Sequence, residues 1–542
     1  MSLRNRIFLP VILSTMGVLV GCGGNGLSIT RPTPPPTGGF SQSNLNGTYV
    51  FSASGTDING FAYAMVGTFS ANGSGGITSG VLDLNDAGFP LSNPVISPVA
   101  NASITGGSYT LGVDGRGQIK LNNRTAFSSP IILDFVLQDS THGLVTEFDG
   151  NASGSGSLDL QSSGSTPTGS YAFILSGAYS SGFLVTVGDF TLNGASMTGL
   201  QDLNSQGIPY AGETLTGAFA LGPSSTPATQ ISSAPSGSSP NFTITYDVIA
   251  IDATHLKFIE MDANGTLAGD AFAQSSTTLP TGTLAFTLIG STSTSVTGAG
   301  GFMVTDGNGN ITNASTEDVN DTGNVSASFI NFSGVYAAGG TGRYTLGGFV
   351  NFIGGTEYVA YPSNGGVLLL EMDNAGMMAG AAYPQTAGAT LDASQGYALN
   401  QSGTNLGLAT GQPVEIDDIA EFATASSGGT LTGIIDENFA PGSSPIYALA
   451  LSGNYTTPDT TGRGQLGANA GNGNNTTLNG GFNLTYYAVD GTTFPFIETD
   501  NGQVTAGVFV KQNSSASSSA ATRAHMYALP PMVRPRITRK QK

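Results

Sequence analysis

A pair of carboxylic acids recurs four times in this chain at one fixed spacing: a Glu, an Asp two residues later, and a Gln fourteen residues after the Glu. The copies are Glu147, Asp149 and Gln161; Glu260, Asp262 and Gln274; Glu371, Asp373 and Gln385; and Glu498, Asp500 and Gln512. Side chains at positions i and i+2 of a strand share one face. Each pair therefore has the residue types of a glycosidase acid/base pair or of a cation site. Enzymes seldom keep four tandem copies of one catalytic pair, so we expect no catalysis and no catalytic residue.

A structural role explains the repeated Glu better. Mostly apolar residues precede each Glu, which indicates partial burial, and a buried carboxylate needs a partner. Three of the four units have an Arg at a matching place. We therefore predict a repeated bridge from Arg to Glu that closes each unit or pins its turn, with the candidates Arg116, Glu147, Glu260, Arg343, Glu371, Arg463 and Glu498. The second unit has Gly222 and Pro223 in place of the Arg, so we expect it to use Lys257 or to be the loosest unit.

Other polar residues suggest turns rather than sites. The segment 306–317 imitates a calcium-binding EF-hand loop, but Ile311 stands where that loop needs Gly. We interpret it as a hairpin turn, and the repeated Asp-x-Asn steps (such as Asp83 and Asn85) as turn caps. His142 and His255 share a position that the third and fourth units fill with Gly366 and Thr493, which indicates a tolerant turn. We expect no metal and no cofactor, because no catalytic triad, metal cluster or phosphate loop recurs.

The fixed spacing identifies a tandem array of one folding unit. The four units span residues 45–161, 169–274, 282–385 and 396–512, joined by seven to ten residues. Alternating stretches in the first unit predict eight strands, over 48–54, 61–70, 76–84, 107–113, 117–122, 131–138, 143–149 and 156–161. We therefore predict an all-β protein of four tandem antiparallel units, most simply eight-stranded up-and-down barrels, with β-sandwiches as the alternative. Such short linkers suggest beads with limited freedom.

The N-terminus has the pattern of a secreted, lipid-anchored protein. Arg4 and Arg6 precede an apolar run over residues 7–20, which is too short to span a bilayer comfortably. The sequence Leu19-Val20-Gly21-Cys22 resembles the lipobox of bacterial lipoproteins, in which a peptidase cuts before the Cys and that Cys is lipidated. We predict a signal peptide over 1–21, lipidation at Cys22, and a tether over 22–44 rich in Pro, Gly and Thr. Gly23 resembles the outer-membrane sorting pattern, so we expect a protein lipid-anchored in the cell outer membrane, on its periplasmic or surface side.

Charge is distributed unevenly. All 35 acidic residues lie between Asp57 and Asp500, and only seven basic residues lie within the repeats, giving them a formal charge of −28. A surface with that charge would repel nucleic acid, which we do not expect as a partner. Six basic residues lie in the segment 513–542, which we interpret as a disordered basic tail. Cys22 is the only cysteine, so the repeats contain no disulfide.

The repeats are similar to those of uncharacterised repeat lipoproteins of soil bacteria. The resemblance rests on the Gly-x-Tyr, Asp-x-Asn and Gly-Arg-Gly motifs, covers nearly the whole mature chain, and implies no activity. We predict a lipid-anchored envelope protein with a structural or adhesive role, since tandem units give reach and multivalency. The alternative is a surface lipoprotein that binds a glycan or small ligand; the absence of Trp counts against it. The expected partners are the membrane, through Cys22, and an extracellular glycan or an envelope protein.

Overall fold

The computed structural model describes residues 39–87, 98–123, 130–162, 167–179, 182–219, 228–234, 242–292, 295–326, 328–340, 342–407, 413–442, 445–470 and 482–515. Its strands form four antiparallel sheets in chain order, one for each repeat. Three sheets are closed eight-stranded barrels. The third is a nine-stranded sheet in which β18, at one end, also pairs with β19, which lies next to the two-residue strand β20 at the other end. The all-β prediction is confirmed, and the first, second and fourth units are the predicted eight-stranded up-and-down barrels. The predicted lipidation site, Cys22, lies outside the described residues.

The first barrel shows how closely alternation predicts the strands. Its strands are β1 (Asn46–Asp57), β2 (Ala62–Asn72), β3 (Gly76–Asp86), β4 (Val99–Leu111), β5 (Arg116–Asn123), β6 (Ile131–Leu137), β7 (His142–Glu147) and β8 (Ala152–Leu160). Each strand pairs with the next, and β1 pairs with β8 to close the barrel. Tyr49, Phe51 and Ala53 alternate inward on β1 and belong to a core that fills the lumen.

The other three units repeat this order. The second barrel has β9 (Gly169–Tyr179), β10 (Gly182–Asn193), β11 (Ser196–Ser205), β12 (Ile208–Ala218), β13 (Ala228–Ala234), β14 (Phe242–Ala250), β15 (His255–Glu260) and β16 (Ala268–Ala273). The third unit has β17 (Gly282–Thr292), β18 (Val296–Thr305), β19 (Asn310–Asp321), β20 (Asn324–Val325), β21 (Ile330–Ala338), β22 (Tyr344–Val350), β23 (Glu357–Pro362), β24 (Val367–Glu371) and β25 (Gly376–Pro384). The fourth barrel has β26 (Gly396–Asn405), β27 (Val414–Thr424), β28 (Thr430–Ala440), β29 (Ile446–Tyr455), β30 (Arg463–Ala470), β31 (Phe482–Tyr487), β32 (Thr493–Glu498) and β33 (Gln503–Lys511).

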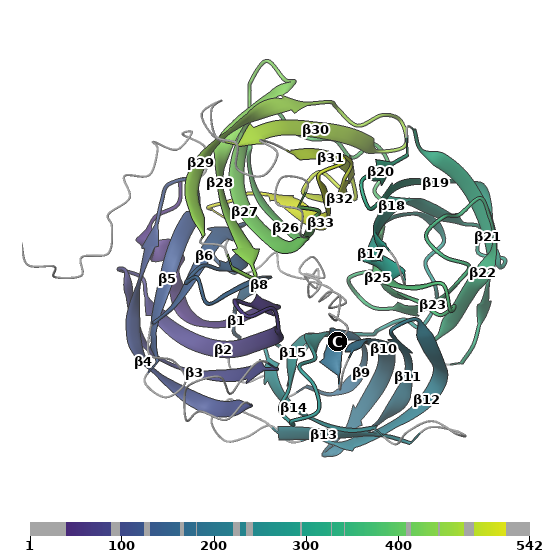
Figure 1. Ribbon diagram of the computed structural model, residues 1–542, viewed down its shortest axis with the longest axis horizontal. Coiled ribbons are helices and arrows are strands. Elements are labelled where there is room, and N and C mark those ends of the chain that lie inside the picture. The colour runs from purple at the N-terminus through teal and green to yellow at the C-terminus, as the bar shows by residue number, and fades with distance from the viewer. Residues whose placement is uncertain are drawn as a thin grey trace, which may run out of the picture.

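The four units form a ring rather than a string of beads (Figure 1). The first strand of each unit lies near the centre, while β4, β13, β21 and β29 lie on the outside. Each barrel contacts the next in sequence, and the fourth contacts the first through β26, β27 and β28 against β6, β7 and β8. We call these contacts the first junction (barrels one and two), the second (two and three), the third (three and four) and the seam (four and one).

Apolar side chains fill the junctions as well as the lumens. Val50 and Val66 of barrel one pack with Ile249 and Ile259 of barrel two, and Leu144 packs with Ile419 across the seam. A larger cluster runs through the second and third junctions. The seventh strand of each unit, counted without the two-residue β20 (β7, β15, β24 and β32), is buried along its whole length, because one face lines the lumen and the other faces the neighbouring barrel.

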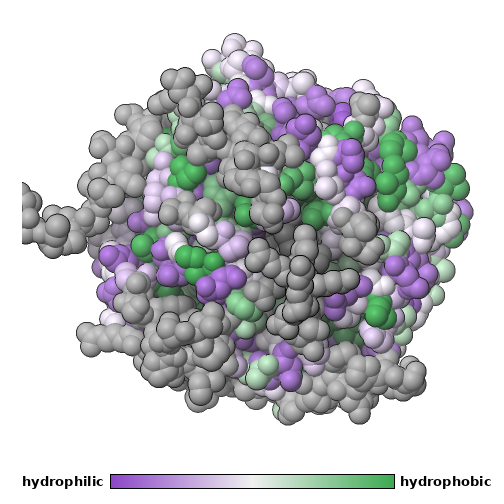
Figure 2. All heavy atoms as spheres, in the orientation of Figure 1, coloured by the Kyte–Doolittle hydropathy of each residue, from purple (hydrophilic) through white to green (hydrophobic). Residues whose placement is uncertain are grey.

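One face of the ring is chemically mixed. Hydrophilic and hydrophobic residues are interspersed among the described residues that are visible on it (Figure 2). Exposed apolar residues of the third unit include Phe329, Val335, Val350 and Ile353. No helix within the described ranges is both long enough and apolar enough to cross a membrane.

Candidate functional site at the barrel junctions

The Asn of each Asp-x-Asn step reaches from its own barrel into the next one. It lies near the end of the third strand and points outward, and its side-chain amide donates to backbone carbonyls beside the repeated Glu of the neighbouring unit. Asn85 donates to Glu260 O and Gly265 O, each at 2.7 Å, and Asn204 to Glu371 O at 2.8 Å and Gly376 O at 3.0 Å. Asn320 bonds three carbonyls around Glu498. Asn438 closes the circle at the seam, donating to Glu147 O at 2.6 Å and Ala152 O at 2.8 Å. These steps are junction contacts as well as turn caps. The Oδ1 atoms of Asn204 and Asn320 accept from Gly207 N and Gly323 N, each at 2.9 Å, so our interpretation of them as turn caps gives only part of their role.

The repeated Gln makes a second contact in the same direction. Gln161 donates to Ala250 O, Gln274 to Pro362 O, Gln385 to Thr461 O and Ala488 O, and Gln512 to Asp114 O and Leu137 O, at 2.8 to 3.0 Å. Three of these Gln side chains approach the Gly of a Gly-Arg turn. Gly462 has φ +98°, and a Cβ there would lie 2.2 Å from Nε2 of Gln385. The Gly is needed both for its backbone conformation and for the approach of the Gln.

The arginines of these turns bind Asp, and not the repeated Glu. Arg343 forms a two-point ion pair with Asp202 of the preceding unit, at 2.7 and 2.8 Å. Arg463 pairs in the same way with Asp318, at 2.8 and 2.6 Å. In each case a Tyr hydroxyl, of Tyr361 or of Tyr487, also donates to the Asp. Within the described residues, the predicted bridges from Arg343 to Glu371 and from Arg463 to Glu498 are not formed. The cause is topological, because the Arg side chain points out of its barrel and the Glu side chain points in.

Among the described residues, the ion pair between Arg and Asp is longer at the seam and is missing at the first junction. At the seam, Arg116 bonds Asp114 of its own turn at 2.9 Å and lies 3.7 Å from Asp436 of the fourth barrel, so its predicted bridge to Glu147 is also corrected. At the first junction no Arg exists, and Oδ2 of the buried Asp83 has no hydrogen-bond partner in the described part of the chain. Burial, opposed by the Asn101 amide and reinforced by Asp247, raises the pKa of Asp83 to about 7.

The repeated Glu and Asp hold a tight turn. Each seventh strand ends at its Glu, and the Asp two residues later accepts a bond from a turn amide, as in Asn264 N to Asp262 at 2.9 Å. The buried Glu side chain accepts from the following strand: Leu267 N to Glu260 at 2.9 Å, Met378 N to Glu371 at 2.8 Å, and Thr505 Oγ1 to Glu498 at 3.0 Å. The Asp therefore lies beyond the end of the strand rather than on its face, but the two carboxyls of each pair stay close together, since each Asp raises the pKa of its Glu.

These glutamates are buried, and none of the ion pairs among the described residues includes one of them. Burial, reinforced by Asp262, raises the pKa of Glu260 to about 9, although the Leu267 amide opposes it. Burial and then Asp373 raise the pKa of Glu371 to about 8. Burial also raises the pKa of Glu147 and of Glu498 well above the usual range. At neutral pH the glutamates are therefore protonated and act as hydrogen-bonding groups rather than as charges.

The first junction contains a different set of charges. His142 bonds Asp159 at 2.7 Å in barrel one, and both His255 and Lys257 bond Asp270 at 2.7 Å in barrel two. Burial alone would raise the pKa of Asp159, but His142, Lys257 and His255 outweigh it and hold that pKa below its usual range. Both histidines are buried, which corrects their interpretation as a tolerant turn. Lys257 binds Asp270 instead of substituting for the missing Arg.

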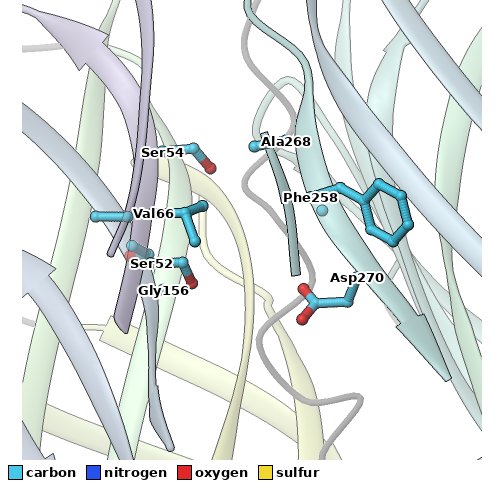
Figure 3. A pocket seen from close by; sticks show the side chains of 10 residues that line it. Ser52, Ser54, Val66, Gly156, Phe258, Ala268 and Asp270 are labelled. Carbon is cyan, nitrogen blue, oxygen red and sulfur yellow. The ribbon is translucent and has the colours of Figure 1, made fainter. Parts of the chain in front are cut away.

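A small cavity lies beside these charges (Figure 3). Ser52, Ser54 and Val66 of barrel one line one side, and Ala268 and Asp270 of barrel two line the other. It leaves about 20 Å³ for the centre of a water-sized sphere, which is room for one water molecule. Among the described residues, no group of three His, Cys, Asp or Glu side chains is placed to hold a metal ion.

A sequence signal for the junctions existed in the seventh strands. Residues such as Phe258 and Ile259, or Leu369 and Leu370, are apolar on both faces of the strand, which is typical of burial on both sides. The identity of the partner surface was not readable, because the Asn and Gln contacts join residues more than 70 positions apart.

Comparisons with known proteins leave the family open. No protein-family model matches the chain, and no curated protein matches it. Among solved structures, it is similar to the isotype 1 transferrin binding protein B of serogroup B Neisseria meningitidis, at 9% identity over 70% of this chain and 82% of that one, with a TM-score of 0.20. It is also similar to intact Ap-TbpB with its N and C lobes, at 9% identity over 89% and 97%, with a TM-score of 0.18. TM-scores this low do not indicate a shared overall fold.

Proposed function

We propose that this protein is a lipid-anchored component of the bacterial cell envelope with a structural or adhesive role, in which the four barrels act as one rigid ring. The observation that supports this proposal most is that the repeated polar residues contact neighbouring barrels or stabilise turns. The Asn and Gln of each unit bind the neighbouring unit, the Asp and Arg form ion pairs across the second and third junctions, and the Glu holds a turn. None of these repeated groups is left over for catalysis, so we propose that the protein is not an enzyme.

The lumens support the same proposal. Aromatic and aliphatic side chains fill each one, and the apolar cavity within the third unit also leaves only about 20 Å³ for the centre of a water-sized sphere. A carrier of small molecules needs a cavity of about 300 Å³ or more. A partner of the ring therefore binds its outer surface, and a rigid ring presents four related surfaces in fixed positions.

The test compares the intact protein with a ring-opened variant. The full-length chain and its Asn438→Leu, Gln512→Leu variant are applied to a glycan array and to solubilised envelope fractions. The proposed role predicts capture of an envelope protein by the intact ring, weakened in the variant, and no glycan signal. Glycan binding that is equal for both would favour the alternative, a ligand-binding surface lipoprotein. Turnover of any arrayed glycan would overturn the non-enzymatic proposal.

The proposed anchor has its own test. Cells grown with a radiolabelled fatty acid should incorporate label into the protein, and the Cys22→Ser variant should not. Label retained in that variant would overturn the proposed lipidation at Cys22.

A further inference from the structure

The interior of the fourth barrel differs from the other three in one row of side chains. Gln401, Asp418 and Glu437 are direct neighbours across β26, β27 and β28. They lie on the same faces of their strands as the core residues Leu399, Ala420 and Ile435, so they point into the lumen. The same row in the other units is Ala53–Met65–Leu84, Leu175–Thr186–Leu203 and Leu288–Ala299–Val319. Two acids and an amide thus replace core side chains in one repeat of four.

Within the described ranges, no basic side chain forms an ion pair with these acids. Gln401 and Asp418 are at most 1% exposed, and Nε2 of Gln401 donates to Oδ2 of Asp418 at 2.6 Å. In the described part of the chain, Oε1 of Gln401 and Oδ1 of Asp418 have no hydrogen-bond partner. The two basic residues of the fourth unit are engaged elsewhere, Arg463 with Asp318 and Lys511 with Asp392. The row therefore has more acceptors than donors, and a proton on one of its acids is the donor that it lacks.

The outward faces of the same strands hold the seam. Asp417, next to Asp418, accepts from Ser153 and Ser155 of barrel one at 2.7 and 2.8 Å. Asp436 and Asn438 flank Glu437 and contact Arg116 and the turn after Glu147. The chain itself connects the barrels at the other three junctions, whereas the seam depends on non-covalent contacts. A change in spacing between β27 and β28 would act directly on it.

We propose that Asp418 and Glu437 together hold at least one proton at neutral pH, and that its loss at alkaline pH loosens the seam and opens the ring. Two negative carboxylates side by side in an apolar lumen repel each other strongly. That repulsion pushes β27 and β28 apart and weakens the contacts on their outer faces. The ring is closed while the pair holds its proton, and the seam gives way first when the proton leaves.

The acidic groups around the pair all act to raise its pKa values, and only the amide of Gln401 opposes them at Asp418. Asp418 faces Glu437 and Glu498 in addition to Asp417, Glu437 lies next to Asp436, and Glu498 lies next to Asp500. Burial and then Asp436 raise the pKa of Glu437 to about 7, and burial and then Glu437 raise the pKa of Asp418 well above its usual range. A folded-state pKa above the unfolded value gives stability that is complete at low pH. That stability begins to fall as pH rises through about 7, where Glu437 titrates, and falls further at higher pH as Asp418 also loses its proton.

Hydrogen exchange of the full-length protein at pH 6 and pH 9, corrected for intrinsic exchange rates, tests this. We expect protection in residues 142–160 and 414–440 to fall by at least about tenfold at the higher pH, the effect of one unit of pKa shift. Residues 196–205 and 367–384 of the second junction are the internal reference and should change less. The Asp418→Asn, Glu437→Gln variant should keep its seam protection at pH 9. Equal loss at both junctions, or the same pH profile in the variant, would overturn the proposal.

Two further measurements distinguish a bound proton from other causes. The triple variant Gln401→Ala, Asp418→Met, Glu437→Leu replaces the polar row with the residue types that occupy the same positions in the first barrel. Because those residues already pack inside a barrel of this kind, the variant should fold and should also keep its protection at pH 9. Calcium chloride added to the wild-type protein at pH 9 should have no effect on the seam. Restored protection by calcium would mean that the acids bind a cation, and the proposal of a held proton would be rejected.

Discussion

At the scale of single residues, the ring depends on buried amides that satisfy buried carbonyls. Replacing Asn438 with Ala leaves Glu147 O and Ala152 O without their donor at the seam. A buried polar group without a partner costs about 1 to 3 kcal/mol. We therefore expect Asn438→Ala to lower the free energy of unfolding by about 2 to 4 kcal/mol in urea titrations. The exposed Asn331 is the matched control, and its Ala variant should change that free energy by less than about 0.5 kcal/mol. Similar effects from both variants would contradict the account.

The Arg to Asp pairs give a graded series at the same scale. Arg343 bonds Asp202 through two short contacts, whereas Arg116 lies 3.7 Å from Asp436. Removing one partner of a buried pair costs about 3 to 5 kcal/mol. We expect Arg343→Ala to reach that range. Arg116→Ala removes less across the seam, but it also leaves the buried Asp114 without its 2.9 Å partner, so its cost falls mainly within its own turn. Because the Asp is the partner left behind, adding Asp202→Leu should restore part of the loss in a double-mutant cycle, and adding Glu371→Gln should not. If Glu371→Gln restored the loss and Asp202→Leu did not, Arg343 would pair with Glu371 and the account would be wrong.

The repeated glutamates make stability depend on pH. The pKa of Glu260 is about 9 in the folded protein, far above about 4.3 in an unfolded chain. The folded state therefore binds the extra proton, and stability falls as pH rises between these values. We expect a melting temperature that is higher at pH 5 than at pH 9, and a weaker pH dependence in Glu260→Gln. A melting temperature that rises with pH would show that these glutamates are ionised in the folded protein.

At the scale of elements, the Gly-Arg turns are shaped by the neighbouring barrel. Gly462→Ala imposes a side chain on a residue with φ +98° and displaces Gln385. Gly428 has φ +73° and no atom within 4 Å of an added Cβ, so its Ala variant measures backbone strain alone, about 1 to 3 kcal/mol. We expect Gly462→Ala to cost clearly more in calorimetry. Equal costs would mean that the Gln contact contributes little.

The sequence predicted the elements well and their contacts poorly. Alternation located all eight strands of the first barrel, because one face of each must fill the lumen. The four recurring signatures identified the unit. The junctions could not be predicted. From the sequence alone, Asn85 and Gln161 have the character of exposed polar residues, and only the position of the neighbouring barrel shows that they bind it. The predicted partner of Arg343 was wrong for the same reason. Alternation along a strand indicates which side chains share a face within one unit, whereas the Asp that binds Arg343 belongs to another unit.

At the scale of the whole molecule, the formal charge of the repeats overstates the field around them. Twenty-three of the 35 acidic residues are buried, and burial raises the pKa of many of them. Much of the negative charge calculated from the sequence is therefore neutralised by protons or by the buried Arg and Lys. The prediction that nucleic acid is not a partner stays a prediction, and it now depends on the smaller charge of the outer surface.

Closure of the ring is the central claim, and the two ends of the folded region test it most directly. Asn44 donates to Ser514 O at 3.1 Å, so the start of barrel one and the end of barrel four lie side by side. Cys22 is the only cysteine, so Ser43→Cys and Ser515→Cys in a Cys22→Ser background accept a donor and an acceptor dye without competing sites. The account predicts high transfer efficiency between them in single molecules at pH 6. Four domains of about 13 Å radius of gyration laid in a row would separate the dyes by on the order of 100 Å, and the absence of transfer would contradict the ring.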